Sequence, residues 1–352
     1  MQLRAVFTEA VDHALLAEHV PALVAYRDAI RRLADELGCE SSEEAVLAAR
    51  SRFDPATYAN RLLERSATGM LLLDSGYTSG QPFSLEEHRR KIRLPQAEVV
   101  RLETLAERFV ADSATPGDWF GAVRAALREA VGGGAVGFKS IAAYRAGLRL
   151  KAVDPGDVAD AYRKLRDDAV SGRRVRLSGE TLCHALLLEA AEEIAMLGVP
   201  LQFHCGFGDN DENLADCSPL GLRPLLVQER YAGLRVVLLH CYPYHREAAY
   251  LCGVYRDVYM DLSLTLPLAG VDGKRAMRET LGLCPWTKLL YASDASRLPE
   301  IYFVAAAVHR EALAGAFAEL VDHRVLSARD ATDAGIDVLS RNARRVYELQ
   351  KS

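Results

Sequence analysis

The stretch KLLYASDAS, residues 288–296, ends an apolar run on an aspartate, Asp294, and belongs to a repeated pattern that decides the fold. Three earlier apolar runs also stop at a side chain that can bind a metal ion or a proton: AVGFKS (135–140) at Lys139, LQFHCG (201–206) at His204 and RVVLLHC (235–241) at His240. Runs of this length are typical of strands buried on both faces of a parallel sheet. We therefore predict that the four side chains lie on one rim of a parallel barrel, where barrel enzymes place their active sites.

Three further runs extend the alternation of strands and helices: GMLLLDSGY (69–77), AEVVRLET (97–104) and DVYMDLS (257–263). Each of the seven predicted strands precedes a helical pattern, which indicates parallel connections and an α/β fold. Residues 1–66 instead have helical spacing throughout. We predict a helical cap segment, 1–66, followed by a TIM-type (β/α)8 barrel domain, 67–352, that forms one compact unit and lacks the first barrel strand.

The composition narrows the classes of function. The chain has 352 residues, half of them hydrophobic, with a net charge of -5 and no block rich in Lys or Arg, which argues against nucleic acid as a partner. No apolar stretch approaches the roughly 20 residues that span a bilayer, and the N-terminus has no signal-peptide pattern. The seven scattered cysteines favour reduced thiols. We expect a cytoplasmic protein, a small-molecule substrate and a homodimer.

His204 and His240 are the first candidates for chemistry, because imidazole is the commonest metal ligand and a strand end holds it rigidly. A single histidine beside an apolar run is more often a hydrogen-bonded core residue. Two on successive strands, together with Asp294 on another, favour a metal site. Asp294 could bind the ion and accept a proton from bound water, although it could instead cap the following helix; Ser296 is an alternative cap.

Lys139 is flanked by apolar residues and would be costly to bury without a partner. It could fix an anionic substrate, act as a base, or pair with Glu103. Arg101 and Glu103 lie two residues apart, so on a continuous strand they would share one face. Further side chains follow strand ends and are candidates for contact with substrate or metal ligands: Tyr144, Asp209, Asp211, Arg223, His245, Asp261 and Arg297.

Several motifs together resemble the amidohydrolase superfamily, and more narrowly the amidohydrolase-2 branch, including domains associated with glutamine-synthetase-like proteins. They are GFKSIAAYRAGL (137–148), HCGFGDND (204–211), SPLGLRPLL (218–226), LLHCYPYHREAAYL (238–251), SDASRLPE (293–300) and SRNARRVYEL (340–349). The resemblance extends from about residue 60 to the end.

This resemblance implies an eight-stranded barrel that holds one or two divalent metal ions, most often Zn²⁺, with Mn²⁺ as an alternative. It implies that His204 and Asp294 bind metal, that His240 binds metal or polarises the substrate, and that Asp294 relays protons. Lys139 occupies the position at which relatives with two metals carry a carboxylated lysine.

One feature departs from the family pattern. The family ends its first strand in His-x-His, and no such pair occurs in this chain. His13 and His19 have a spacing and a helical setting that cannot imitate it. We expect either an omitted segment or its replacement by another part of the chain, because an open barrel exposes two strand edges.

The primary hypothesis is a metal-dependent hydrolase that cleaves a C–N or ester bond of a small, anionic substrate. A metal-dependent decarboxylase or lyase of the same fold is the first alternative. A binding or regulatory module without catalysis is the second, since zinc sites normally use at least three protein ligands and two are absent.

Overall fold

The structure is a computed structural model that describes residues 2–74, 76 and 84–349. Its described strands form a parallel sheet in chain order: β1 (Leu71–Asp74), β2 (Gln96–Arg101), β3 (Ala135–Ser140), β4 (Leu201–Cys205), β5 (Val236–His240) and β6 (Val258–Met260). The seventh predicted strand joins this sheet through a parallel bridge between Met260 and Leu289. The parallel α/β order predicted from the sequence is therefore confirmed.

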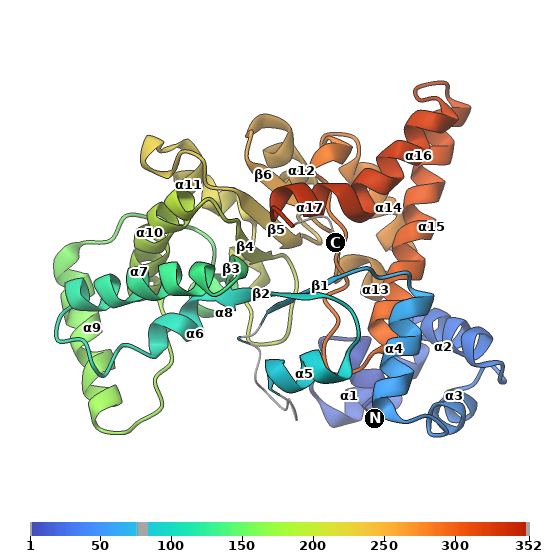
Figure 1. The fold of residues 1–352 in the computed structure, drawn as a ribbon, viewed down its shortest axis with the longest axis horizontal. Helices are drawn as coiled ribbons and strands as arrows, with labels where there is room; N and C mark the ends of the chain where they lie inside the picture. The colour runs from blue at the N-terminus through green and yellow to red at the C-terminus, as the bar shows by residue number, and fades with distance from the viewer. Residues whose placement is uncertain (1, 75, 77–83, 350–352) are drawn as a thin grey trace.

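Helices connect successive strands and cover the sheet (Figure 1). The side chains of Thr115 and Asp154 cap the N-termini of α7 and α9. Helix α10 ends at Gly198, which has a left-handed backbone conformation. The helices of this half are α6 (Leu102–Glu107), α7 (Pro116–Gly132), α8 (Ala142–Arg145), α9 (Pro155–Val170), α10 (Glu180–Leu197), α11 (Arg223–Val227) and α12 (His245–Val254). After β6 follow α13 (Thr265–Ala269), α14 (Val271–Thr280), α15 (Glu300–Asp322), α16 (Ala328–Ile336) and α17 (Asn342–Val346).

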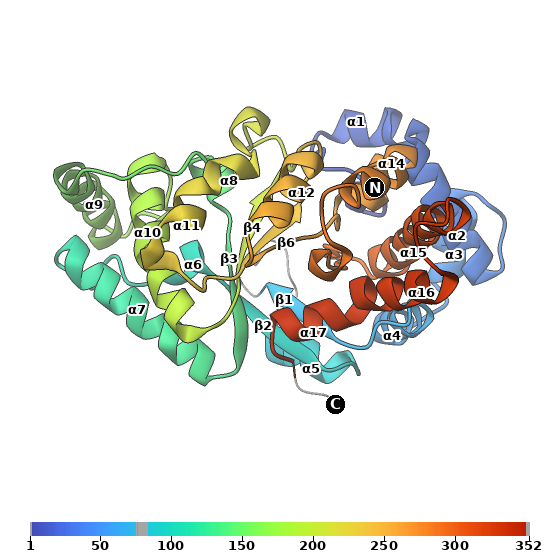
Figure 2. The same ribbon diagram turned by 90° about the horizontal axis from the view of Figure 1, so that it is seen from above.

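The first 66 residues contain helices and no strand within the part that the structure describes: α1 (His13–Glu18), α2 (Val24–Leu37), α3 (Glu43–Arg50) and α4 (Pro55–Arg65). Leu3, Tyr26 and Leu33 pack with Ile301 and Val304 of α15 in one apolar cluster. These helices and α15 lie on the opposite side of the sheet from α7, α9 and α10 (Figures 1 and 2). The division into a cap segment and a barrel domain stays a prediction.

Strand β1 has one paired edge and one free edge. It pairs with β2, and no strand among the described residues pairs with its other side. One cavity of about 1560 Å³ lies between the first and seventh strand positions. It is lined by Leu71 and Leu72 of β1 and by Leu290 and Tyr291 of the run 288–296. Among the described residues, no strand pairing joins the first and seventh strand positions, and residues from both line the cavity.

Helix α15 corrects one expectation. Glu300–Asp322 spans 23 residues and is long and apolar enough to cross a membrane by length and composition, so the expectation that no such stretch exists was wrong. Half of its most apolar window is buried inside the protein. Core helices pass the same test, and the contacts of α15 with the N-terminal helices are of that kind.

The C-terminal motif is tied to the seventh strand position by a buried amide. Nδ2 of Asn342 donates hydrogen bonds to the carbonyl oxygens of Trp286 (2.7 Å) and Leu289 (2.8 Å), and Asn342 is fully buried. We expect Asn342→Ala to lower the free energy of unfolding by roughly 2–4 kcal/mol, because two carbonyl groups lose their donor in a dry site. Urea denaturation measures the change. Arg329→Ala, an exposed change in α16, is the matched control, and equal stability of both variants would contradict the prediction.

Candidate functional site

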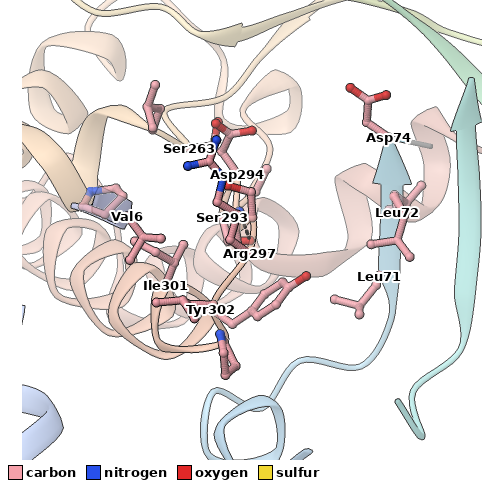
Figure 3. Close-up of a pocket in the computed structure, with 18 of the residues that line it drawn as sticks. Val6, Leu71, Leu72, Asp74, Ser263, Ser293, Asp294, Arg297, Ile301 and Tyr302 are labelled. Atoms are coloured by element: carbon pink, nitrogen blue, oxygen red, sulfur yellow. Dashed lines mark hydrogen bonds between the residues drawn. The ribbon is translucent and has the colours of Figure 1, made fainter. Parts of the chain in front are cut away.

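The carboxyl ends of the strands surround the large cavity, as predicted. Lys139, His204 and His240 stand at the ends of β3, β4 and β5, and all three line the cavity together with Asp294. The imidazole rings of His204 and His240 lie 4.7 Å apart between centroids. Figure 3 shows Asp294 and Arg297 on one side of the cavity and Asp74, at the tip of β1, on the other. The four residues that the apolar runs singled out therefore share one rim.

Asp74 anchors the positive charges of this rim. Its carboxylate accepts hydrogen bonds from Arg101 and lies 3.5 Å from Nζ of Lys139. Burial opposes ionisation of Asp74, but the charges of Lys139 and Arg101 outweigh it and hold the pKa below its usual value. All three side chains are less than a fifth exposed, with 17% for Asp74. Lys139 is thus a paired cation, and its partner is Asp74 rather than Glu103.

Glu103 corrects a second prediction. Strand β2 ends at Arg101, and Glu103 lies in α6, so the two residues do not share a strand face. The buried Glu103 carboxylate accepts hydrogen bonds from Oγ of Ser140 (2.7 Å) and the backbone N–H of Ile141 (3.1 Å). It therefore fixes the backbone just after Lys139 and is not part of the cavity wall.

His240 is held as a neutral imidazole. Its backbone N–H donates to Oδ1 of Asp261 (2.8 Å), and its Nδ1 lies 2.7 Å from Oγ of Ser263, whose hydroxyl in turn donates to Asp261. Its backbone adopts a left-handed φ of 68°, which turns the chain at the strand end. Burial, and then the neighbouring His204 and Lys139, lower the pKa of His240 well below its ordinary value. The ring is therefore uncharged at neutral pH.

Asp294 faces the cavity, where water can reach it, while protein atoms surround it on all other sides. The loss of bulk solvent raises the pKa of this carboxyl, and the charges of Lys139 and His204 offset part of the effect. Its φ of 48° is left-handed. Helix α15 begins at Glu300 with Pro299 at its N-cap, so Asp294 does not cap that helix and Ser296 does not either. A carboxyl with a raised pKa beside a cation is suited to proton transfer.

The structure separates the other predicted residues into two groups. Tyr144, Asp209, Asp211, Asp261 and Arg297 line the cavity, and the Tyr144 ring lies 4.4 Å from the His204 ring. Arg223 is exposed at the start of α11, and His245 lies 2.8 Å from Glu279 through Nε2; neither belongs to the cavity wall. Their roles in binding stay predictions, and in the structure both side chains lie outside the cavity wall.

The sequence reasoning missed three acidic residues. Asp74 ends an apolar run as Lys139 does, so the same rule would have found it. Glu9 comes from the N-terminal segment and also lines the cavity; burial, then Asp294 and Asp209, raise its pKa to about 7. Glu212 lies in the loop after β4, with its Oε2 2.9 Å from Nε2 of His204. Nothing in the sequence marks Glu9 as part of a site on distant strands, whereas Glu212 follows Asp209 and Asp211 in one loop and the rule that named those two would have found it.

The donors present make an incomplete metal site. Among the described residues, no three His, Cys, Asp or Glu side chains gather closely enough to hold a metal ion. Zinc sites use at least three protein ligands. Of the expected ligands, Nε2 of His204 faces Glu212, and Nδ1 of His240 is engaged by Ser263. The residues described here therefore do not fit a complete metal centre by themselves.

Comparisons with known proteins match the chain to one family. A family model described as amidohydrolase matches residues 92–349. The chain is 32% identical over 362 residues to protein fluG of Emericella nidulans; the match covers 95% of this chain and 42% of fluG. The chain thus spans less than half the length of that relative.

Solved structures give the same fold. A Lactobacillus casei protein assigned as a metal-dependent hydrolase superposes with a TM-score of 0.87 at 32% identity, covering 99% of this chain and 92% of that chain. A uronate isomerase from Thermotoga maritima superposes with a TM-score of 0.67 at 15% identity, covering 94% of this chain and 81% of that chain. At that lower identity the likeness establishes the fold alone.

We expect Asp74→Asn to destabilise the protein by about 3 kcal/mol, because it removes the carboxylate charge that lies 3.5 Å from the buried Lys139 ammonium and that accepts hydrogen bonds from Arg101. Chemical denaturation at neutral pH measures the loss. The double variant Asp74→Asn, Lys139→Met should recover part of it. Asp35→Asn, at an exposed helix ion pair, should change stability by less than about 1 kcal/mol. A loss at Asp74 no larger than at Asp35 would refute the anchoring role.

Glu9 should make stability depend on pH near neutrality. Its folded-state pKa of about 7 lies above the ordinary value of 4.5, so the folded protein binds the proton more tightly than the unfolded chain does. That contribution is complete below pH 4.5 and is lost as the pH rises through 7. The native protein should therefore lose roughly 2 kcal/mol relative to Glu9→Gln between pH 5 and 8. Glu18→Gln, on the exposed face of α1, should follow the native curve, and parallel curves for native protein and Glu9→Gln would rule out the effect.

Proposed function

The chain belongs to the amidohydrolase family, and on that premise we propose that it is a metal-dependent hydrolase that cleaves a C–N or ester bond of a small, anionic molecule. The observation that carries the proposal is the shared rim: two imidazoles, a carboxyl group with a raised pKa and a paired lysine converge on one large cavity. Hydrolysis of such bonds needs a group that takes a proton from water and a group that stabilises developing negative charge.

Asp294 is the proposed proton acceptor. It is open to the cavity, and its raised pKa makes it a stronger base toward water than an ordinary aspartate. It must be ionised to act as a base, so the acid limb of the rate profile should follow its pKa, with activity rising as the pH rises through a value above the usual aspartate range. We propose that His240, neutral and fixed by Asp261 and Ser263, contributes the lone pair of its Nε2 to a metal ion. Ser263 donates its hydroxyl to Asp261, so the single N–H of the ring lies on Nδ1 and is accepted by Ser263.

Positive side chains on the rim favour an anionic substrate. Lys139 and Arg101 both contact the carboxylate of Asp74, and Arg297 also lines the cavity. Arg145 and Arg176 line it as well, and burial together with the charge of Arg176 lowers the pKa of Arg145. Guanidinium groups at a cavity wall suit a carboxylate or phosphate group of a substrate. The acidic residues Glu9 and Asp209 limit how much net negative charge the cavity accepts.

A divalent ion, Zn²⁺ or Mn²⁺, would supply Lewis acidity and lower the pKa of bound water. The likeness to the Lactobacillus casei protein supports metal dependence. His204, His240 and Asp294 are the residues we propose to contribute to such a site, and completing it requires at least one donor beyond those gathered in the described residues.

The experiment combines metal analysis with substitutions in the cavity. The purified protein is analysed for bound metal by mass spectrometry before and after treatment with a chelator, and is assayed against a panel of N-acyl amino acids and carboxylate esters. We expect His204→Ala and Asp294→Asn each to lower kcat/KM at least about 100-fold, because each removes a group at the reacting centre.

His323→Ala is the matched control, since this exposed histidine follows α15 at the surface. Its activity should equal that of the native protein. Full activity in both cavity variants, or unchanged activity in protein proved free of metal, would overturn the proposed function. Release of carbon dioxide from carboxylate substrates without hydrolysis would instead support the lyase alternative.

A further inference from the structure

Part of the cavity wall is apolar and takes no part in the chemistry proposed above. Leu71 and Leu72 of β1 lie across the cavity from Ile301 and Tyr302 of α15, and we call these residues the apolar arm (Figure 3). Leu71 and Ile301 are 6% and 5% exposed, whereas Leu72 and Tyr302 are half-buried at the cavity surface. The arm therefore presents apolar side chains to whatever occupies the cavity.

Three separate apolar clusters border the arm. Leu71 belongs to a cluster with Ile92, and Tyr302 packs against the same cluster. Leu72 packs against a second cluster, which includes residues of β5, and Ile301 is part of a third, formed with the N-terminal helices. Because the cavity is lined from all three clusters, a ligand that covers the arm would remove apolar surface of each cluster from water.

The arm begins beside the polar rim. Leu72 lies two residues before Asp74 on the same strand, so the two side chains share one face of β1 and are roughly 7 Å apart along it. On the other side of the cavity, Tyr302 lies beneath Asp294 in the view of Figure 3. A molecule whose polar group reaches the rim therefore has room along the arm for the rest of its structure.

The size of the cavity also favours a ligand with an apolar part. At about 1560 Å³ the cavity exceeds the roughly 300–1,000 Å³ of most small-molecule sites. A space walled by apolar side chains gives water few hydrogen-bond partners and accepts apolar ligands. A substrate that filled only the polar rim would leave the apolar arm in contact with water.

We propose that the apolar arm binds an aliphatic chain of the anionic substrate, so that the site selects acyl compounds of medium chain length over short ones. The proposal rests on the proposed function for the bond that is cleaved, and it adds the part of the substrate that the arm recognises. The polar rim holds the carboxylate and the scissile bond, and the arm covers the chain. Each methylene group that is buried strengthens binding by up to about fourfold.

The experiment measures the binding of straight-chain alkanoates by isothermal titration calorimetry, which needs neither turnover nor added metal. Butanoate, hexanoate, octanoate and decanoate carry the same carboxylate and differ only in the length of the chain. We expect the Kd to fall by up to about fourfold for each added methylene until the arm is filled. A Kd that is the same for butanoate and decanoate in the native protein would overturn the proposal without any variant.

Leu72→Trp tests where the chain binds. The larger side chain occupies part of the arm, so the affinity for decanoate should fall at least about tenfold, while the affinity for butanoate should change by less than about twofold. Leu283→Trp, the same substitution at a leucine that is 57% exposed and lies outside the cavity wall, is the control and should leave the whole series unchanged. A folded Leu72→Trp protein that binds decanoate as tightly as the native protein does would overturn the proposal.

Failure of the proposed function gives a different result from failure of this inference. A protein that hydrolyses no amide or ester, yet binds alkanoates more tightly as the chain lengthens and loses this dependence in Leu72→Trp, supports the arm and not the hydrolase. A protein that hydrolyses short acyl substrates but binds all four alkanoates equally supports the hydrolase and overturns the arm.

Discussion

Parallel pairing of the strands is the constraint on which the rest of the structure depends. Strands that run in one direction end at the same edge of the sheet, so whatever follows each apolar run is brought to a single rim. Lys139 and His204 are separated by a long helical connection, yet β3 and β4 pair directly. The interior of β5 is buried throughout, and the side chains proposed for chemistry stand at the last positions of the strands.

Polar and charged groups at such a rim are stable only when other groups compensate them. Lys139 lies in an apolar strand, and Asp74 from the neighbouring end of β1 supplies its anion while also binding Arg101. His240 is kept neutral by its surroundings, with Asp261 and Ser263 holding the backbone and ring. Burial raises the pKa of Asp294, and the charges of Lys139 and His204 offset only part of that effect. The rim thus separates Asp74, which pairs with cations, from Asp294, a carboxyl with a raised pKa that suits proton transfer.

The elements that follow a local rule could be predicted from the sequence, and those that depend on distant contacts could not. Apolar runs that stop at Lys139, His204 and His240 identified the strands, because burial on both faces leaves a continuous apolar signal. Glu103 was misassigned since β2 ends two residues earlier and α6 begins at once, and no local pattern marks that boundary. Glu9 reaches the cavity through the path of the N-terminal segment, which only the folded chain defines.

Family membership and local geometry answer different questions here. The isomerase that shares this fold at 15% identity demonstrates that the barrel alone does not specify a reaction. What distinguishes one reaction from another is the state of individual side chains: which carboxyl is protonated, which imidazole nitrogen carries a hydrogen, and which cation already has a partner. In this chain Asp74 sets one of those states by pairing with Lys139. The specificity of the site therefore has to arise from the cavity-facing parts of Lys139, His204 and Asp294.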